Sequence, residues 1–209
     1  MICKSLLSCI ALFFAASCAT FPDASNAPLS AEAMIDRAYP GMPEALVKRA
    51  VQNPDQKLCS RPASQKLSSE EAARVASSAR ASMRYPSSGK LAGDWKAGEQ
   101  LVSNGAGMRI RDGRVEQVKE NGALCVNCHA LDPKDLNVGN LGPALTGYGL
   151  QRGSSDAVIR YTYEKIYNAW AYYPCSNMPR LGHNRYLTPE QITHVVAYLV
   201  DSQSPVNRK

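Results

Sequence analysis

The sequence lacks several features that would assign it to common protein classes. No apolar run approaches the roughly 20 residues that cross a bilayer, so we expect no membrane span beyond what the N-terminus contributes. Lys and Arg outnumber Asp and Glu by 24 to 18, but they form no block and no RNA-binding signature, so nucleic-acid binding is not expected. Neither a Ser/His/Asp set nor paired carboxylates are visible. The 209 residues also contain no internal repeat, which leaves one domain, or one domain with a helical appendage.

The N-terminus has the pattern of an export signal. Lys4 precedes an apolar stretch from Leu6 to Ala16, and Ser17-Cys18-Ala19 fits a signal peptidase site, which predicts a signal peptide over residues 1–19. Ala16-Ser17-Cys18 also resembles a weak lipobox, although Ala15 stands where Leu is usual, so lipidation at Cys18 stays open. Both interpretations take the mature protein out of the cytoplasm, and we expect it in the periplasm.

Hydrophobic spacing and breakers predict a mainly α protein, with no convincing alternating strand. Residues 20–92 are expected to form an N-terminal helical extension, and residues 93–209 the main domain. Helical patterns cover the two parts of 30–53 on either side of the breaker at 39–43, then 68–84, 93–102, 155–170 and a last helix that Thr188 opens. Residues 52–64 are expected to be a loop, and 103–120 a surface loop or hairpin.

Cys125-x-x-Cys128-His129 is the pattern in this sequence that indicates a functional site. Two thiols one turn apart can add to the two vinyl groups of haem, and the adjacent histidine then lies under the iron. The competing interpretation is a zinc or redox Cys-x-x-Cys. Zinc needs a second ligand pair, and Cys59 and Cys175 are not spaced as one. The motif therefore predicts one covalently bound haem c.

The sixth iron ligand has three downstream candidates, Met178, His183 and His194. Met178 is favoured because it lies in an irregular, Pro-flanked loop and is the only Met after the haem motif. His183 is its competitor, whereas His194 falls within the last helix and is expected to be a packed or surface histidine. The Pro143 carbonyl is expected to accept the proton of the other His129 ring nitrogen; the lesser alternative is that residues 142–147 are a plain turn.

The order of these motifs resembles class I cytochrome c, and more closely SoxX, the monohaem subunit of the SoxAX cytochrome of thiosulfate oxidation. The resemblance covers about residues 85–208. It rests on Gly93-Asp94-Trp95-Lys96-Ala97-Gly98-Glu99, the CxxCH motif, Gly142-Pro143-x-Leu145-x-Gly147, Lys165-Ile166-Tyr167-Asn168-Ala169, Cys175-Ser176-Asn177-Met178-Pro179-Arg180-x-Gly182-His183 and the tail from Leu199 to Asn207. The segment 103–121 departs from a minimal cytochrome c, in which the first helix leads directly into the motif.

The resemblance implies a class I cytochrome c fold and a role in electron transfer. SoxAX couples thiosulfate oxidatively to a cysteine of the SoxYZ carrier, with the catalytic haem on SoxA. This subunit would accept electrons from SoxA, pass them to a soluble acceptor cytochrome c, and hold no catalytic residue itself. The alternatives are a free-standing periplasmic monohaem carrier and a haem-based sensor with a displaceable sixth ligand.

Cys59 and Cys175 are left after the signal and the haem motif take the other cysteines. Pairing is favoured in an oxidising compartment. We predict an intrachain disulfide between them, which would join the N-terminal extension to the Met178 loop. The competing prediction is a bridge from one of them to SoxA.

Overall fold

The computed structural model describes residues 29–105, 107–111, 114–117, 121–132, 134 and 139–208. Side chains are not described for Ala45, Arg49 and residues 108–117. The expected signal segment 1–19, with the candidate lipidation site Cys18, lies outside the described residues. Within the described part, no helix is both long enough and apolar enough to cross a membrane.

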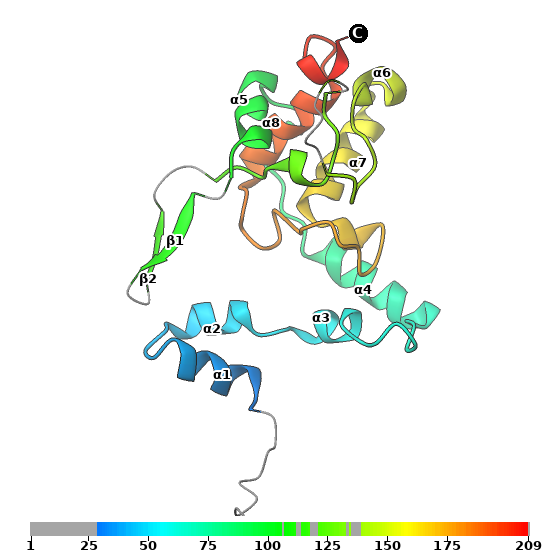
Figure 1. The fold of residues 1–209 in the computed structure, drawn as a ribbon. Helices are drawn as coiled ribbons and strands as arrows, with labels where there is room; N and C mark the ends of the chain where they lie inside the picture. Colours follow the sequence, from blue (N-terminus) through cyan, green and yellow to red (C-terminus); the bar gives the residue numbers. More distant parts are fainter. Residues whose placement is uncertain are drawn as a thin grey trace, which may run out of the picture.

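The fold is mainly α, as the sequence predicts, and α5, α6 and α7 gather around α8 (Figure 1). The α-helices are α1 (Ala31–Ala38), α2 (Glu44–Ala50), α3 (Pro54–Cys59), α4 (Ser69–Ala81), α5 (Trp95–Ser103), α6 (Tyr148–Arg152), α7 (Asp156–Tyr167) and α8 (Pro189–Val200). Short 3-10 helices are η1 (Cys125–Asn127), η2 (Ala169–Ala171) and η3 (Pro205–Asn207), and the strands are β1 (Met108–Arg111) and β2 (Arg114–Gln117).

Side-chain caps start the main helices where the sequence predicts. Ser68 and Glu71 form a reciprocal capping box at the start of α4. Thr188 opens α8 in the same way, with Pro189 at the first helical position. Asp94 accepts the Lys96 N–H and so caps α5. Each cap supplies acceptors for backbone N–H groups that have no partner inside the helix.

Two segments differ from the prediction. Residues 52–64 are not all loop, because Asn53 and Gln56 form a capping box that starts α3, with Pro54 at its first turn. The predicted helix over 155–170 ends early, since α7 stops at Tyr167. Asn168 leaves the helical conformation there, and its side chain accepts the Trp170 N–H at the start of η2.

The segment before the CxxCH motif contains a hairpin, one of the two forms that the sequence predicts for 103–120. β1 pairs antiparallel with β2, from Met108 opposite Gln117 to Arg111 opposite Arg114. Its base is closed by a hydrogen bond from Gly122 N–H to the Gly105 carbonyl, 2.9 Å long. The hairpin extends away from α5 and α8 in Figure 1.

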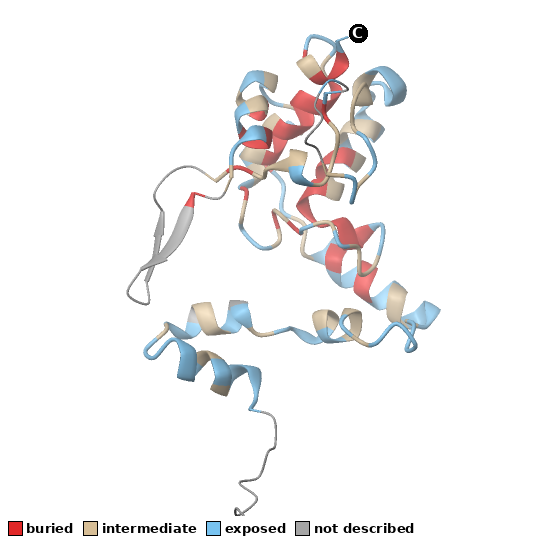
Figure 2. Ribbon diagram, in the orientation of Figure 1, coloured by how far each residue is buried: buried red, intermediate tan, exposed pale blue. Residues whose placement is uncertain are grey.

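The core lies where α5 and α7 pack on α8, and the buried residues concentrate there in Figure 2. α5 and α8 approach most closely at Gly98, where a Cβ would overlap the His194 carbonyl oxygen. Ile192 and Val196 on α8 are fully buried. A helix crossing of this kind requires a residue without a side chain.

The N-terminal extension contacts this core through α4. Val75 and Ala79 of α4 form a second buried cluster with Trp170 and Ala171. α1 has no buried residue, and α1 and α2 lie apart from the core in Figure 2. The part of the extension that packs on the domain is therefore α3 and α4.

Candidate functional site

The CxxCH motif lies on η1 and the turn after it. The Cys128 and His129 N–H groups both donate to the Cys125 carbonyl, at 3.1 and 2.8 Å. Leu124 enters the turn with a φ of 41°, in the left-handed region. Cys125 and Cys128 are both free and half-buried. Of the three motif residues, Cys125 and His129 line an apolar cavity of the core, and Cys128 does not.

The His129 ring has a defined orientation. Its Nδ1 lies 2.7 Å from the Pro143 carbonyl oxygen. Because a carbonyl only accepts, this contact places the proton on Nδ1 and leaves the lone pair on Nε2. That is the tautomer a histidine needs to ligate a metal through Nε2. The position predicted for Pro143 therefore agrees with a ligand role for His129.

The segment 139–147 is bound to the motif along its backbone. Gly139 N–H donates to Val126 and Gly142 N–H to Cys128, both at 2.8 Å. Gly142 lies flat against the His129 imidazole, and a Cβ there would overlap the ring. Sequence reasoning singled out Pro143 but did not assign Gly142 this role.

A small apolar cavity of about 40 Å³ connects the predicted ligands. Cys125, His129 and Met178 all line it. The remaining lining side chains are aliphatic and come mainly from α5, α7, α8 and the loops beside the motif: Val102, Leu131, Leu145, Ile166, Leu181, Val195 and Leu199. Residues that are 49 positions apart in the sequence thus face one water-excluding space.

The loop that carries Met178 is held by its own hydrogen bonds. The Trp170 indole N–H donates to the Ser176 carbonyl at 2.9 Å, and the Met178 N–H donates to Ser176 Oγ at 3.2 Å. After Met178, the chain is fixed by Gly182 N–H, which donates to the Tyr167 carbonyl. A Cβ at Gly182 would overlap the Tyr167 ring, so the loop lies directly on α7.

The two other candidate ligands lie elsewhere. His194 Nδ1 accepts the Asp94 N–H at 2.9 Å, which ties the start of α5 to α8 and gives this histidine a packing role. His183 is half-buried but is not among the residues that line the Met178 cavity. Burial, and secondarily the Arg180 charge, lower the pKa of His183, while Asp55 acts in the opposite direction.

Burial also changes the chemistry of Cys125. It raises the pKa of the thiol to about 11, with a further contribution from Cys128. A thiolate is therefore disfavoured here, whereas an uncharged thioether loses nothing by burial. Among the described residues, no three His, Cys, Asp or Glu side chains gather as a metal site would require.

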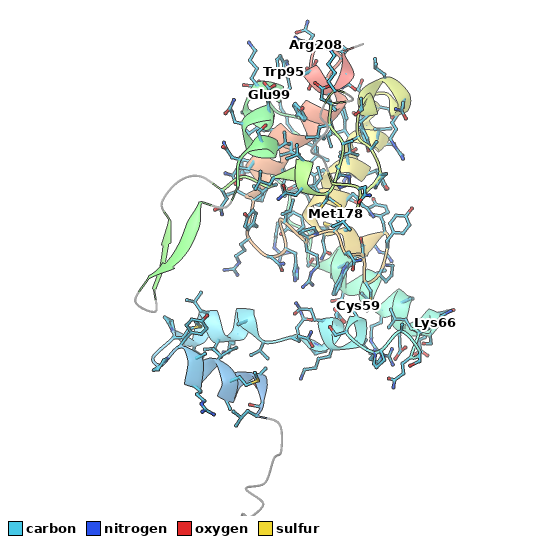
Figure 3. All side chains as sticks on the ribbon, in the orientation of Figure 1. Cys59, Lys66, Trp95, Glu99, Met178 and Arg208 are labelled. Carbon is cyan, nitrogen blue, oxygen red and sulfur yellow. A yellow bond between two sulfur atoms is a disulfide. The ribbon has the colours of Figure 1, made fainter. Side chains whose placement is uncertain are left out.

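The predicted disulfide is present. Cys59 and Cys175 are bonded, with their Cα atoms 5.2 Å apart and a sequence separation of 116. The bond joins the last residue of α3 to the loop three residues before Met178, and Cys59, labelled in Figure 3, lies where the extension meets the domain. The capping pattern Asn53-Pro54-x-Gln56 is the local sequence feature that could have predicted α3.

A second hollow of about 170 Å³ lies on the other side of the motif. Glu99, Asp132 and Tyr198 are among its lining residues, and Leu131 separates it from the Met178 cavity. It contains none of the predicted ligands.

One similarity to a known protein stands out. The sequence is 38% identical over 159 residues to an uncharacterized lipoprotein of Aquifex aeolicus (strain VF5). The match spans 76% of this chain and 74% of the relative. The chain belongs to the same family as this lipoprotein. The sequence matches no family model.

Proposed function

We propose that this chain is an exported monohaem c-type cytochrome that transfers electrons. The observation that carries the proposal is the shared cavity, which brings Cys125, His129 and Met178 together. Cys125 and Cys128 would hold the haem through thioethers, and His129 Nε2 and the Met178 thioether would ligate its iron. The haem would supply one-electron Fe(III)/Fe(II) chemistry.

Each residue has a definite task in this proposal. The Pro143 carbonyl keeps the Nδ1 proton on His129 and so keeps Nε2 available as a ligand. A thioether ligand favours the reduced iron and raises its potential. The aliphatic walls exclude water, which also favours the less charged reduced site.

We further propose that the chain is a SoxX-like subunit of a SoxAX-type complex. Support for this comes from the sequence resemblance over about residues 85–208. In that role the chain accepts electrons from a SoxA partner and passes them to a soluble cytochrome c. Thiosulfate would be coupled to a SoxYZ cysteine at the partner's haem, so this chain would be the redox subunit of an S-thiosulfotransferase. The alternative is a free-standing periplasmic carrier.

The ligand assignment is tested by Met178→Ala. We expect the reduced variant to bind CO, which the wild type does not, and the midpoint potential to fall. Arg185→Ala, an exposed change on the same loop segment, is the matched control and should do neither. An unchanged spectrum and potential in Met178→Ala would contradict the assignment and return His183 to consideration.

The assembly is tested by purifying the mature chain with whatever binds it. Intact masses and reduced-minus-oxidised spectra then count the haems on each polypeptide. A second haem-bearing protein in the preparation supports the SoxAX role, and thiosulfate with its carrier protein is the next assay. One low-spin haem on a chain that elutes alone supports the free-standing carrier.

The lipoprotein name of the relative also bears on location. We propose that Cys18 is lipidated and anchors the exported protein to a membrane. Cys18→Ala should then move the protein from the membrane fraction to the soluble fraction, and the mass of the wild type should include a diacylglyceryl group. A wild-type mass that begins after Ala19 without lipid would contradict this proposal.

A further inference from the structure

The N-terminal extension contacts the loop that carries Met178 through the Cys59–Cys175 disulfide and through α4. We propose that α3 and α4, bonded to the loop through Cys59–Cys175, form a brace that positions Met178 on the haem iron. This inference rests on the proposed function, because it assumes that Met178 is a ligand. It makes Cys59, Cys175 and Trp170 positioning residues, since none of them lines the ligand cavity.

The covalent part of the brace acts close to the ligand. Cys175 is three residues before Met178, so the disulfide fixes one end of the short segment that carries the thioether. Cys175 has a φ of 62°, in the left-handed region that residues other than glycine seldom adopt. The bond to α3 therefore restrains the loop at a point where its backbone turns sharply.

The non-covalent part ties the same loop to α4. Arg80 Nη1 donates to the Ala171 carbonyl at 2.6 Å, at the end of η2 where the loop begins. Val75 and Ala79 pack against Trp170, whose indole N–H donates to the Ser176 carbonyl. From α4 the restraint thus passes through Trp170 to the residue that accepts the Met178 N–H.

The far side of the loop is held by a different contact. The Arg180 guanidinium lies 4.1 Å from the centre of the Trp170 ring, and the Arg180 residue is 7% exposed. Trp170 is therefore contacted both by α4 and by the chain immediately after Met178. The segment is thus connected to the extension on both sides of Met178: before it by the Cys175–Cys59 disulfide to α3, and after it by Arg180, which contacts Trp170 and through it α4.

The extension itself is held together where the disulfide attaches. Arg61 Nη2 lies 2.7 Å from Glu71 Oε2, across the turn between α3 and α4. Glu71 also belongs to the capping box of α4. α3 is thus fixed to α4 rather than only to the loop. Loss of the disulfide should release the loop while α4 stays packed on η2.

The test compares holoproteins with and without the brace. Cys59→Ser/Cys175→Ser removes the covalent tie, and Trp170→Phe removes the indole N–H donor together with part of the ring that packs on α4 and Arg180. Ser155→Ala is the matched control, because it removes the cap of α7 far along the chain from the Met178 loop. The three readouts are CO binding by the reduced protein, the midpoint potential, and hydrogen exchange of the amides over 176–178.

We expect both brace variants to bind CO and to shift their potential toward that of Met178→Ala. We also expect their 176–178 amides to exchange roughly tenfold faster or more, since local opening no longer requires two restraints to break. Ser155→Ala should change neither the potential nor these amides. If the double variant yields no holoprotein, the disulfide of the matured wild type is reduced with a phosphine and alkylated before the same measurements.

Two results would overturn the brace, and they are distinguishable. If Met178→Ala binds CO but the brace variants do not bind CO and keep the wild-type midpoint potential, Met178 is a ligand that needs no brace, and the proposed function stands. If Met178→Ala itself changes nothing, the ligand assignment fails and the brace proposal fails with it.

Discussion

At the scale of single residues, Gly142 is tightly constrained because it packs against the ring of His129, the proposed haem ligand. A Cβ at Gly142 would overlap the His129 ring, while the next residue supplies the carbonyl that orients it. We expect Gly142→Ala to displace the imidazole and reduce covalent haem incorporation severalfold, measured from the absorbance of the reduced pyridine haemochrome per mole of protein. Ala144→Ser, at an exposed neighbouring position, is the control. Full incorporation in Gly142→Ala would show that the segment moves aside without cost.

His183 should make stability depend on pH. Burial lowers its pKa in the folded protein below the usual value of about 6.5. Between those two pKa values the unfolded chain binds more protons, so the free energy of unfolding falls as the pH drops below about 6.5. Urea unfolding at about pH 7.5 and pH 5 should show a smaller loss for His183→Gln than for the wild type. Equal losses in the two proteins would contradict this.

The ligand residues illustrate how far the sequence alone reaches. Cys125, Cys128 and His129 can be proposed from the sequence because covalent haem attachment needs these residue types at a fixed local spacing. The sequence favours Met178 over His183 and His194, but that Met178 and His129 line one cavity follows from the packing of α5, α7 and α8. Gly142 belongs to a motif that the sequence shows, but its packing role cannot be inferred from local spacing. It follows from a contact between two loops.

At the scale of elements, the crossing of α5 and α8 sets the geometry of the core. An exposed Gly→Ala change inside a helix stabilises by about 1 kcal/mol. We expect Gly98→Ala to have the opposite sign and destabilise by about 1–3 kcal/mol, because the added methyl would overlap the His194 carbonyl. Thermal unfolding measures the sign, with the exposed Lys96→Ala on the same helix as the control. A higher melting temperature for Gly98→Ala would show that the helices separate easily.

Helix starts were predictable and some helix extents were not. Ser68 and Thr188 place their helices correctly, since a cap acts on the three residues after it. α3 was missed although Asn53 and Gln56 carry the same capping signal, because Pro54 and Pro62 favoured a loop. The end of α7 depends on Asn168, whose side chain competes for backbone donors in a way that helical spacing does not reveal.

At the scale of the whole molecule, one covalent bond links the extension to the domain. Cys59 and Cys175 are 116 positions apart, so the chain-entropy account assigns their disulfide about 5 kcal/mol of stability. We expect Cys59→Ser/Cys175→Ser to lower the free energy of unfolding by up to that amount, measured by urea unfolding. The exposed change Lys48→Ala is the control. A loss below about 1 kcal/mol would indicate that packing of α4 on η2 already holds the two parts together.

The same bond has a consequence for proteolysis. In Figure 1 the β1–β2 hairpin extends away from α5 and α8, and hairpins that leave the body of a domain are frequent sites of proteolytic cleavage. It lies between Cys59 and Cys175 in the chain, so a single cut there opens the backbone without releasing either fragment. The nicked protein would migrate as one band on a gel without reductant. With reductant it would separate into two, and the larger count of cysteines, including Cys125 and Cys128, would lie on the C-terminal fragment.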